Sequence, residues 1–390
     1  MIMITMPGQK VTAEEVFREQ DRVAPLKIIT LEGASELAKK VDHYLVSWAK
    51  NAGWDNYDTF LLPAECPRFT SGEAKGIIYD SVRGDDLFVM VDVGNYNVRY
   101  KMFGQENRMS SDDHYQDLKR IIQAASGRAS RLNVIMPMLY GGRQHRRSYR
   151  ESLDCAYSLQ ELQSMNVENL VTFDAHDPRV QNAVPLMGFD NFMPYYQVIK
   201  ALFRDYPDLM PCKDNFMVVS PDEGAINRNM YYASVLGVNM GMFYKRRDYS
   251  RVVEGRNPIV AHEYLGESME GKDVFIADDI IASGDSVLDI AYEMKQRKAN
   301  RVFVYATYAI FTAGYEKLDK AYKDGILDGI FGTNLTYISD ETRAKPWFHE
   351  VDVSKYLAYI IAALNHNLSV AALLDPHEKI NTLLKKRGLR

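Results

Sequence analysis

The sequence predicts an α/β protein with two or more domains. Short apolar runs of strand type end in polar loops and are followed by apolar residues at helical spacing, as in residues 274–294. Two strands that run into acidic loops, at 169–177 and 215–224, lie on either side of residue 200 and indicate a duplicated architecture. A chain of 390 residues is also long enough to form more than one domain.

The composition excludes several classes of protein. Hydrophobic residues make up 46% of the chain and charged residues 25%, which suits a globular protein with substantial cores. A formal net charge of −5 gives no basic excess for nucleic-acid binding. The three cysteines lack metal-ligand spacing, and no segment has the pattern of a signal peptide or a membrane span. We therefore expect a cytoplasmic protein that binds neither nucleic acid nor membranes.

The first half of the chain is expected to alternate strands and helices. Residues 1–25 are expected to form an extension with a short N-capped helix outside the main fold. The polar segment 94–112 is expected to be a loop-like surface insertion. The expected strands of this half are 26–31, 76–82, 86–91, 132–138 and 169–173, and its helices start near Ser35, Asp113 and Tyr157.

The second half is expected to repeat this alternation. A helical segment at 193–213, with two prolines, marks the junction between the halves. A helix rich in Leu, Ile and Ala is expected over residues 347–374. The expected strands of this half are 215–220, 238–244, 274–279 and 301–307.

The stretch 274–294 carries the strongest chemical signal. An apolar strand ends in Asp278 and Asp279, and a turn containing Ser283 and Ser286 leads into a helix. Backbone N–H groups and two hydroxyls at a helix start suit a phosphate group. The two carboxylates suit sugar hydroxyls or a hydrated Mg²⁺ ion. The alternative is an ordinary strand–turn–helix connection.

Two other strands end in polar loops that suit the same chemistry. Residues 140–147 place four cations after a buried strand, where they form either a solvated patch or a polyphosphate site. A later strand ends in Asp174 and His176, a carboxylate and an imidazole suited to Mg²⁺ and an ATP oxygen. The alternative for His176 is a hydrogen bond to the neighbouring strand end.

Taken in order, these and other motifs resemble the ribose-phosphate diphosphokinases. The resemblance runs from about Leu26 to Leu374, with extra residues at both ends, at about 46–66 and at 94–112. The motifs are Arg-Phe-x-x-Gly-Glu at 68–73, Tyr-Gly-x-Arg-Gln at 140–144, Asp-x-His at 174–176, Ser-Pro-Asp at 220–222, Lys-Arg-Arg at 245–247 and the acidic phosphoribosyl loop at 278–286.

The resemblance implies a fold and a reaction. The expected fold has two phosphoribosyltransferase-like domains, 26–195 and 196–345, each a mainly parallel β-sheet flanked by helices. Residues 346–390 would form a C-terminal helix and tail that pack back on the first domain. The enzyme would transfer the β,γ-diphosphoryl group of MgATP to the C1 hydroxyl of ribose 5-phosphate, giving AMP and 5-phosphoribosyl 1-diphosphate. The family also implies a dimer-based homo-oligomer, up to a hexamer.

The resemblance also assigns roles to particular residues. Lys245 and Arg247 would be the catalytic cations, at the start of a loop, 246–262, that is mobile and closes over the transferring group. Asp222 would serve the metal or the ribose, although it could instead cap the following helix. The implied ATP contacts are Phe69, Ser71, Glu73, Arg143, Gln144 and His176. The implied Mg²⁺ ligands are Asp174, His176 and Asp222. The implied ribose 5-phosphate contacts are Asp278, Asp279, Ala282, Ser283, Gly284, Asp285 and Ser286.

Three departures from the family pattern keep a regulatory paralogue open, and a second alternative stands beside it. His145 stands where the family has Asp, and Ala282-Ser283 stands where it commonly has Asp-Thr. Asp285 puts a carboxylate beside the phosphate loop, which is unfavourable unless it points away or pairs with a cation. One alternative is a regulatory paralogue with weak turnover. The other is a phosphoribosyltransferase that consumes the diphosphate.

Overall fold

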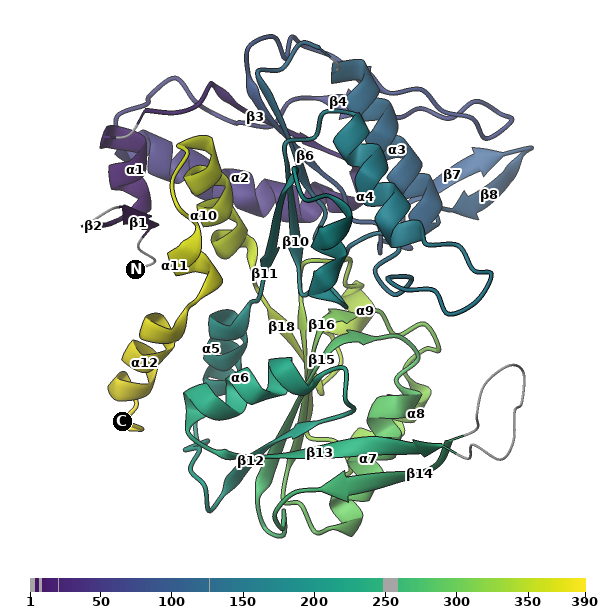
Figure 1. Ribbon diagram of the computed structural model, residues 1–390, viewed down its shortest axis with the longest axis vertical. Coiled ribbons are helices and arrows are strands. Elements are labelled where there is room, and N and C mark those ends of the chain that lie inside the picture. Colours follow the sequence, from purple (N-terminus) through teal and green to yellow (C-terminus); the bar gives the residue numbers. More distant parts are fainter. Residues whose placement is uncertain (1–3, 7–8, 20, 126, 248–258) are drawn as a thin grey trace. The chain divides into compact units, whose positions relative to one another are not determined.

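The computed structural model describes residues 4–6, 9–19, 21–125, 127–247 and 259–390. The chain folds into two compact units and crosses between them repeatedly (Figure 1). Unit 1 contains residues 1–194, 334–337 and 352–376. Unit 2 contains residues 195–333, 338–351 and 377–390.

The core of unit 1 is a five-stranded parallel sheet. Its order, β11-β10-β9-β6-β3, follows the chain without a reversal. Both faces of the sheet are covered, so its strands are continuous apolar runs such as Leu87–Met90. The strands are β3 (Leu26–Thr30), β6 (Asp86–Met90), β9 (Arg131–Ile135), β10 (Asn169–Phe173) and β11 (Gly188–Phe192).

Helices cover the two faces of this sheet (Figure 1). Leu118 and Leu159, on two of these helices, join Leu87 and Val89 in one apolar cluster on one face. On the other face two helices meet where the rings of Trp48 and Tyr359 lie 4.5 Å apart. The helices are α2 (Ser35–Asn51) and α10 (Ser354–Asn365) on this second face, and α3 (Ser111–Ala125) and α4 (Asp154–Ser164) on the first.

The N-terminal helix α1 (Ala13–Glu19) belongs to this packing. Thr12 and Glu15 form a capping box, in which the Thr12 hydroxyl accepts from the Glu15 N–H at 3.2 Å. Phe17 is buried, and its ring contacts those of Trp54 and Phe60. The N-capped helix is therefore confirmed, and its aromatic side chain packs it into unit 1 instead of leaving it outside the main fold.

A buried carboxylate fixes the amino end of this sheet. Asp86 is fully buried and accepts a bidentate ion pair from Arg131 at 2.6 and 2.8 Å. Asn133 and Asn365 each donate a further hydrogen bond to it at 2.8 Å. Several donors compensate the cost of burying the charge. One of them comes from the end of α10, so the late segment 352–376 completes a cluster that the first half of the chain begins.

Unit 2 contains a seven-stranded sheet whose order reverses once. The order is β14-β13-β12-β15-β16-β17-β18, and all pairs are parallel except β13 with β14. The chain leaves β12 toward β13, returns at β15 to the other edge of β12, and continues outward. The strands are β12 (Phe216–Ser220), β13 (Asn239–Arg247), β14 (Ile259–Leu265), β15 (Asp273–Ile281), β16 (Val302–Ala309), β17 (Gly329–Thr333) and β18 (Phe348–Val351).

Helices also cover this second sheet. Leu288 and Leu318 join Val274 and Val304 in one apolar cluster. The ring of Tyr232, on another helix, packs against the ring of Phe275. The helices are α5 (Tyr195–Asp205), α6 (Ile226–Leu236), α7 (Asp285–Gln296), α8 (Glu316–Lys323), α9 (Asp340–Arg343) and α12 (His377–Lys386).

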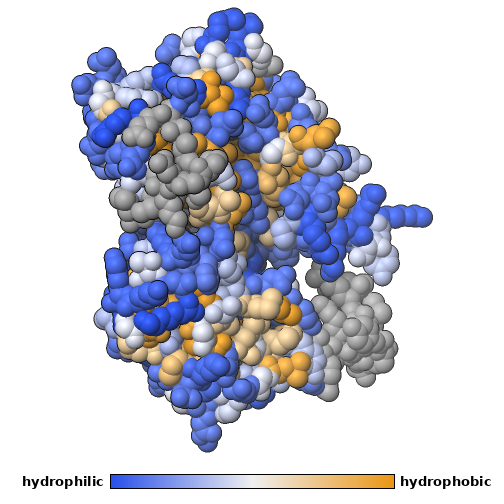
Figure 2. Space-filling view, turned by 60° about the vertical axis from the view of Figure 1, so that its left-hand side comes forward, coloured by the Kyte–Doolittle hydropathy of each residue, from blue (hydrophilic) through white to orange (hydrophobic). Residues whose placement is uncertain are grey.

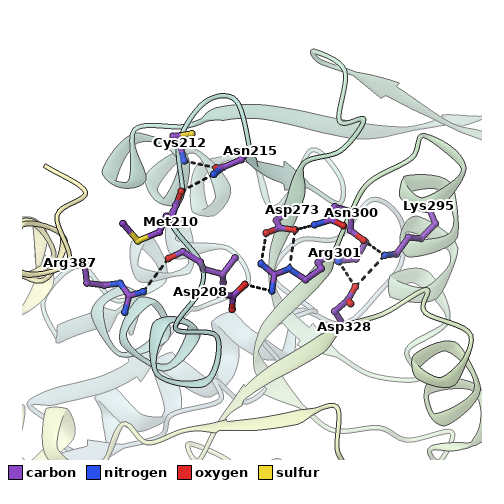
Figure 3. A network of polar contacts seen from close by, with 12 residues as sticks. Asp208, Met210, Cys212, Asn215, Asp273, Lys295, Asn300, Arg301, Asp328 and Arg387 are labelled. Atoms are coloured by element: carbon purple, nitrogen blue, oxygen red, sulfur yellow. Dashed lines mark hydrogen bonds and ion pairs between the residues drawn. The ribbon is translucent and has the colours of Figure 1, made fainter.

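A polar network secures the amino ends of the central strands of unit 2 (Figure 3). Arg301 donates to both oxygens of Asp273, at 2.7 and 3.1 Å, and pairs with Asp208 at 2.8 Å. Asp328 accepts from the Val302 N–H at 2.8 Å and from Lys295 at 3.3 Å. Open α/β sheets bind ligands at the carboxyl ends of their strands, so this network at the opposite ends has a structural role.

The fold class is confirmed as α/β with parallel sheets flanked by helices, but three expected elements are wrong. Segment 94–112 is not loop-like, because it forms a hairpin of β7 (Arg99–Met102) and β8 (Gln105–Arg108). The expected helix 347–374 divides into β18, α10 and α11 (Ala371–Leu374). The expected strand 76–82 is reduced to β5 (Ile77–Ile78), which pairs with β4 (Ala64–Glu65). The remaining elements are β1 (Ile4–Met6), β2 (Gln9–Val11), η1 (Glu32–Ala34) and η2 (Pro178–Ala183).

Figure 2 shows hydrophilic side chains over much of one face, interrupted by hydrophobic patches. Among the residues described, no helix is both long enough and apolar enough to cross a bilayer.

Candidate active site

The acidic loop of unit 2 is a tight turn between β15 and α7. The strand does not end at the two carboxylates, as expected, but continues through them to Ile281, which pairs with Ala309 of β16. Gly284 then adopts a φ of +88° at the start of α7, a conformation that favours glycine. The positive end of the α7 dipole therefore lies directly at the turn.

Asp278 and Asp279 are adjacent carboxylates on the last part of β15. Asp279 is buried, and its N–H donates to Oδ1 of Asp278 at 2.9 Å. Burial, and then the neighbouring charge of Asp279, raise the pKa of Asp278 well above its ordinary value. The Arg228 guanidinium, 3.5 Å from Asp278, opposes this rise. A carboxyl group that keeps its proton closer to neutral pH can donate as well as accept a hydrogen bond.

Asn229 holds the backbone beside this pair. Its side chain is fully buried and faces the peptide group of Ala277. The Nδ2 group donates to the Ala277 carbonyl at 2.7 Å, and Oδ1 accepts from the Ala277 N–H at 2.9 Å. Nδ2 also donates to the carbonyl of Ala225 at 2.9 Å. One amide thus ties the start of α6 to the residue before Asp278. The sequence reasoning missed Asn229; its only signal was a polar residue among the apolar positions of a helix.

Asp222 lies in the loop after β12, beside the acidic loop in the sheet order. Its Oδ1 atom accepts from the N–H groups of Gly224 at 2.9 Å and Ala225 at 3.2 Å. These bonds close the loop before α6, whose N-cap is Ala225 and has no side-chain cap, so the capping alternative is not confirmed, and the metal or ribose role stays a prediction. Because β12 pairs with β13 on one edge and β15 on the other, the loops after β12 and β15 flank the point where the sheet order reverses. Such switch points are where open α/β sheets bind ligands.

The carboxylate of Asp285 has a cationic partner. Lys317 of α8 lies 2.5 Å from its Oδ1 atom, and both side chains are exposed. The Lys317 hydrogen bond, followed by one with Ser283, lowers the pKa of Asp285. Lys317 therefore neutralises the charge of Asp285, the residue that departs from the family pattern. Pairing with a cation was one of the two conditions under which a carboxylate is tolerated beside a phosphate loop.

Lys245 and Arg247 lie on a strand. The expected strand 238–244 extends as β13 to Arg247, and its backbone pairs Lys245 with His262 and Arg247 with Ile259 of β14. Residues 248–258, most of the expected mobile loop 246–262, lie outside the described residues, as do the side chains of 245–262. The expected closing motion and the roles of both cations stay predictions.

In unit 1, the loops after β9 and β10 meet at His145 and His176. The two imidazole rings lie 5.3 Å apart, and Nε2 of His145 lies 3.7 Å from Asp177. Burial and the charge of His176 lower the pKa of His145. Asp174 is buried with a φ of +44°, a costly conformation for a residue other than glycine. The expected Asp-x-His loop and basic loop are thus neighbours.

The other predicted nucleotide residues of unit 1 are exposed or turned into local contacts. Arg143 is exposed, whereas Gln144 donates to the carbonyl of Ser152 at 3.0 Å. Phe69 is 53% exposed in a closed turn, where its N–H donates to the Glu73 carbonyl at 2.7 Å. The Ser71 hydroxyl donates to Glu73 at 2.8 Å. None of these bonds joins the Phe69–Glu73 turn to the histidine loops.

Comparison with known proteins relates both units to one family. Residues 26–165 match the model of the N-terminal domain of ribose phosphate pyrophosphokinase, and residues 194–332 match the phosphoribosyl transferase domain. A ribose-phosphate pyrophosphokinase of Vibrio cholerae is 27% identical over 321 residues, which cover 81% of this chain and 92% of the relative. One of Pasteurella multocida is 26% identical over 355 residues, covering 89% and 98%. The chain belongs to the ribose-phosphate pyrophosphokinase family.

A solved structure supports the fold of this ribose-phosphate pyrophosphokinase family member. The crystal structure of phosphoribosylpyrophosphate synthetase from Mycobacterium smegmatis is similar with a TM-score of 0.70 and 19% identity. The match covers 88% of this chain and 99% of that one. At this identity the likeness concerns the fold alone. It includes both units, which agrees with the two α/β sheets described above.

The described residues of this family member contain no group of three or more His, Cys, Asp or Glu side chains arranged to hold a metal ion. Mg²⁺ is usually bound through one or two protein carboxylates together with substrate phosphates and water. The exposed His176 and the buried Asp174, in its strained conformation at a strand end, fit such a partial site in unit 1. These two residues therefore suit a metal that also takes ligands from a bound phosphate and water.

Proposed function

We propose that the chain is a ribose-phosphate diphosphokinase. It transfers the β,γ-diphosphoryl group of MgATP to the C1 hydroxyl of ribose 5-phosphate and releases AMP and 5-phosphoribosyl 1-diphosphate. Its relatives carry this name at 26 to 28% identity over most of their length, which supports the family and leaves the reaction of this chain to be tested.

The observation that carries the proposal is the construction of the acidic loop in unit 2. A phosphate needs backbone N–H groups and a helix start, which the turn at Gly284 provides. A ribose needs acceptors beside that phosphate, which Asp278 and Asp279 provide from the same strand. Arg228 and Asn229 hold the carboxylates and their backbone before any ligand arrives. Such preorganisation favours the interpretation of this loop as a sugar-phosphate site over its interpretation as a solvated surface loop.

The remaining chemistry is charge stabilisation. Diphosphoryl transfer requires little covalent work from the protein, which acts mainly by positioning and by neutralising developing charge. Lys245 and Arg247, at the end of β13, would supply positive charge to the transferring group. Asp174 and His176 in unit 1, and Asp222 in unit 2, would each serve Mg²⁺, which when bound neutralises phosphate charge on ATP. Arg143 and Gln144 would grip the polyphosphate, and Phe69, Ser71 and Glu73 would contact the adenine. The working form would be a dimer-based homo-oligomer.

The ion pair between Asp285 and Lys317 favours the enzyme over the weak regulatory paralogue. One of the three departures that kept the paralogue open is Asp285, which would repel the sugar phosphate if it were unpaired. With Lys317 at 2.5 Å the pair adds no net negative charge to the loop.

The test is the reaction itself. Purified protein is incubated with ATP, Mg²⁺ and ribose 5-phosphate, and AMP is measured with and without the sugar. AMP that forms only with the sugar supports the diphosphokinase. If turnover instead requires a nucleobase and 5-phosphoribosyl 1-diphosphate, the chain is a phosphoribosyltransferase, and if neither mixture reacts it is the paralogue.

A further inference from the structure

The hairpin β7–β8 lies within residues 94–112, which are extra relative to the family pattern, and stands beside α3 in unit 1 (Figure 1). Burial alternates along β7, where Tyr100 and Met102 are half-buried and Arg99 and Lys101 are exposed. Alternate residues of a strand point to opposite faces of the strand. One face of the hairpin is therefore packed against other residues of unit 1.

The packed face of the hairpin contacts the turn 68–73, the segment with the assigned adenine contacts. The guanidinium carbon of Arg68 lies 4.9 Å from the centre of the Tyr100 ring. A Cβ atom on Gly72 would lie 2.5 Å from the sulfur of Met102, so the Met102 side chain lies directly on the Gly72 backbone. Gly72 also has a φ of +97°, which favours glycine. Both the space and the backbone conformation at this contact suit glycine.

A hydrogen bond joins the same turn to the tip of the hairpin. The N–H of Phe103 donates to the carbonyl of Thr70 at 2.9 Å. Phe103 and Gly104 form a two-residue turn with φ values of +50° and +76°, a conformation that is unusual for a Phe residue. Among the described residues, no other hydrogen bond joins residues 69–73 to another part of the chain. The hairpin tip thus supplies the external hydrogen bond of an otherwise exposed turn.

We propose that the hairpin β7–β8 positions the turn 68–73 for the base of the nucleotide, through the Met102 side chain and the Phe103 N–H. This inference rests on the proposed function, which assigns residues of the turn to adenine. The hairpin holds the backbone of the turn, while the exposed side chains of the turn take their final orientation from the base. A held backbone reduces the ordering that binding requires. The hairpin therefore strengthens recognition of the base and leaves recognition of the polyphosphate unchanged.

The test compares ATP with inorganic tripolyphosphate, which carries the phosphates without the base. Isothermal titration calorimetry with Mg²⁺ present gives the Kd of each and needs no turnover. The hairpin can be removed cleanly, because the Met109 N–H donates to the Val98 carbonyl at 2.9 Å and a two-residue turn can join these residues. We expect replacement of residues 99–108 by Asn-Gly to weaken ATP binding by about 10-fold and to leave the Kd of tripolyphosphate unchanged.

Point variants test the positioning while the hairpin stays in place. Met102→Ala removes the contact with Gly72 and should lower the preference for ATP by about two- to threefold, whereas Met102→Leu, of similar volume, should keep most of it. Phe103→Asn is the matched control, because Asn tolerates a positive φ and keeps the N–H, so it should bind ATP as wild type does. Amide hydrogen exchange in residues 68–75 should be faster in the hairpin deletion and in Met102→Ala, and unchanged in Phe103→Asn.

Four results would overturn the inference. The first is a folded hairpin deletion that keeps the wild-type preference for ATP, and the second is equal weakening of ATP and tripolyphosphate binding, which indicates a structural role only. The third is a loss in Phe103→Asn as large as in the deletion, because the ring itself would then serve the base. If the deletion does not fold, wild-type preference and wild-type exchange in Met102→Ala are the fourth. Wild type that binds both ligands equally would instead remove the adenine assignment of the proposed function, and the inference with it.

Discussion

The candidate loops of the two units differ in how much of their geometry exists before a ligand binds. In unit 2 the carboxylates of Asp278 and Asp279 are partly or fully buried, and Asn229 holds the backbone next to Asp278, although Asp285 in the same loop is exposed. In unit 1 the assigned residues Phe69, Arg143 and His176 are exposed. Under the proposed function, the sugar-phosphate site would be preorganised, whereas the nucleotide site would be ordered by the nucleotide that it binds.

Sheet topology explains part of this contrast. In unit 1 the strand order of the sheet follows the order along the chain, so every connection crosses the sheet in the same direction. In unit 2 the order reverses at β12, and the loops after β12 and β15 leave in opposite directions. The gap that such a reversal opens is the usual ligand crevice of an open α/β sheet. Five predictions can break or sharpen the comparison.

The largest effect is expected at the cations of β13. Lys245→Ala and Arg247→Ala should each lower kcat by about 10²- to 10³-fold with little change in KM, because they meet charge that develops only in the transition state. Steady-state kinetics with ATP and sugar varied separately measures this, and Lys298→Ala, an exposed cation of unit 2, is the control. A change in kcat of less than about threefold would make both residues ordinary surface cations.

The next effect concerns the exposed half of the site. His176→Ala should lower turnover about 10- to 100-fold, the usual cost of weakening a metal site. Because the side chain is exposed, the free energy of unfolding should change by no more than about 0.5 kcal/mol. His43→Ala, at an exposed position of α2, should change neither quantity. Full activity of His176→Ala would show that the metal does not use this residue.

Asn229→Leu tests the preorganised half. It leaves the N–H and carbonyl of Ala277 without their buried partner, so the free energy of unfolding should fall by about 1–3 kcal/mol. Activity toward ribose 5-phosphate should fall more than the apparent affinity for ATP. Asn227→Leu, on the exposed side of the same helix, is the matched control for denaturant unfolding and kinetics. Equal losses in both variants would remove the positioning role.

The pH dependence of stability tests the carboxylate pair. The folded protein raises the pKa of Asp278, so this group's contribution to stability is fully present below its unfolded pKa and is lost as the pH rises through the folded value. The stability of wild type relative to Asp278→Asn should therefore fall with rising pH, by on the order of 1 kcal/mol. Denaturant unfolding of both proteins at several pH values measures the difference. A stability difference that rises with pH would mean that the charge of Arg228 lowers the pKa of Asp278 more than burial and Asp279 raise it.

The smallest effect is expected at the exposed ion pair. Lys317→Ala leaves Asp285 uncompensated beside the phosphate loop, so KM for ribose 5-phosphate should rise a few-fold. Stability should change by less than about 1 kcal/mol, as for other exposed pairs. Adding Asp285→Asn should restore KM, and Lys320→Ala on the same helix should leave it unchanged. A double variant that binds the sugar no better than Lys317→Ala would refute the electrostatic explanation.

The sequence predicted those parts of the molecule that depend on local patterns. Apolar runs located β10 and β12 within a residue or two, because both faces of these strands are buried. The hairpin β7–β8 escaped prediction because its strands are mostly exposed and polar, so they lack an apolar period. The role of Asn229 escaped because it depends on a partner 48 positions away.

The route of the chain between the units has a consequence for protein synthesis. Unit 1 receives its last segment, residues 352–376, only after the whole sheet of unit 2 has been translated. Until then Asp86 lacks Asn365, and Trp48 lacks the ring of Tyr359. A ribosome-bound first half would therefore carry an unfinished core with uncovered apolar surface, the kind of species that aggregates or engages chaperones. Neither unit can be obtained by cutting the gene once, and the first half becomes a finished body only when nearly the whole polypeptide has emerged.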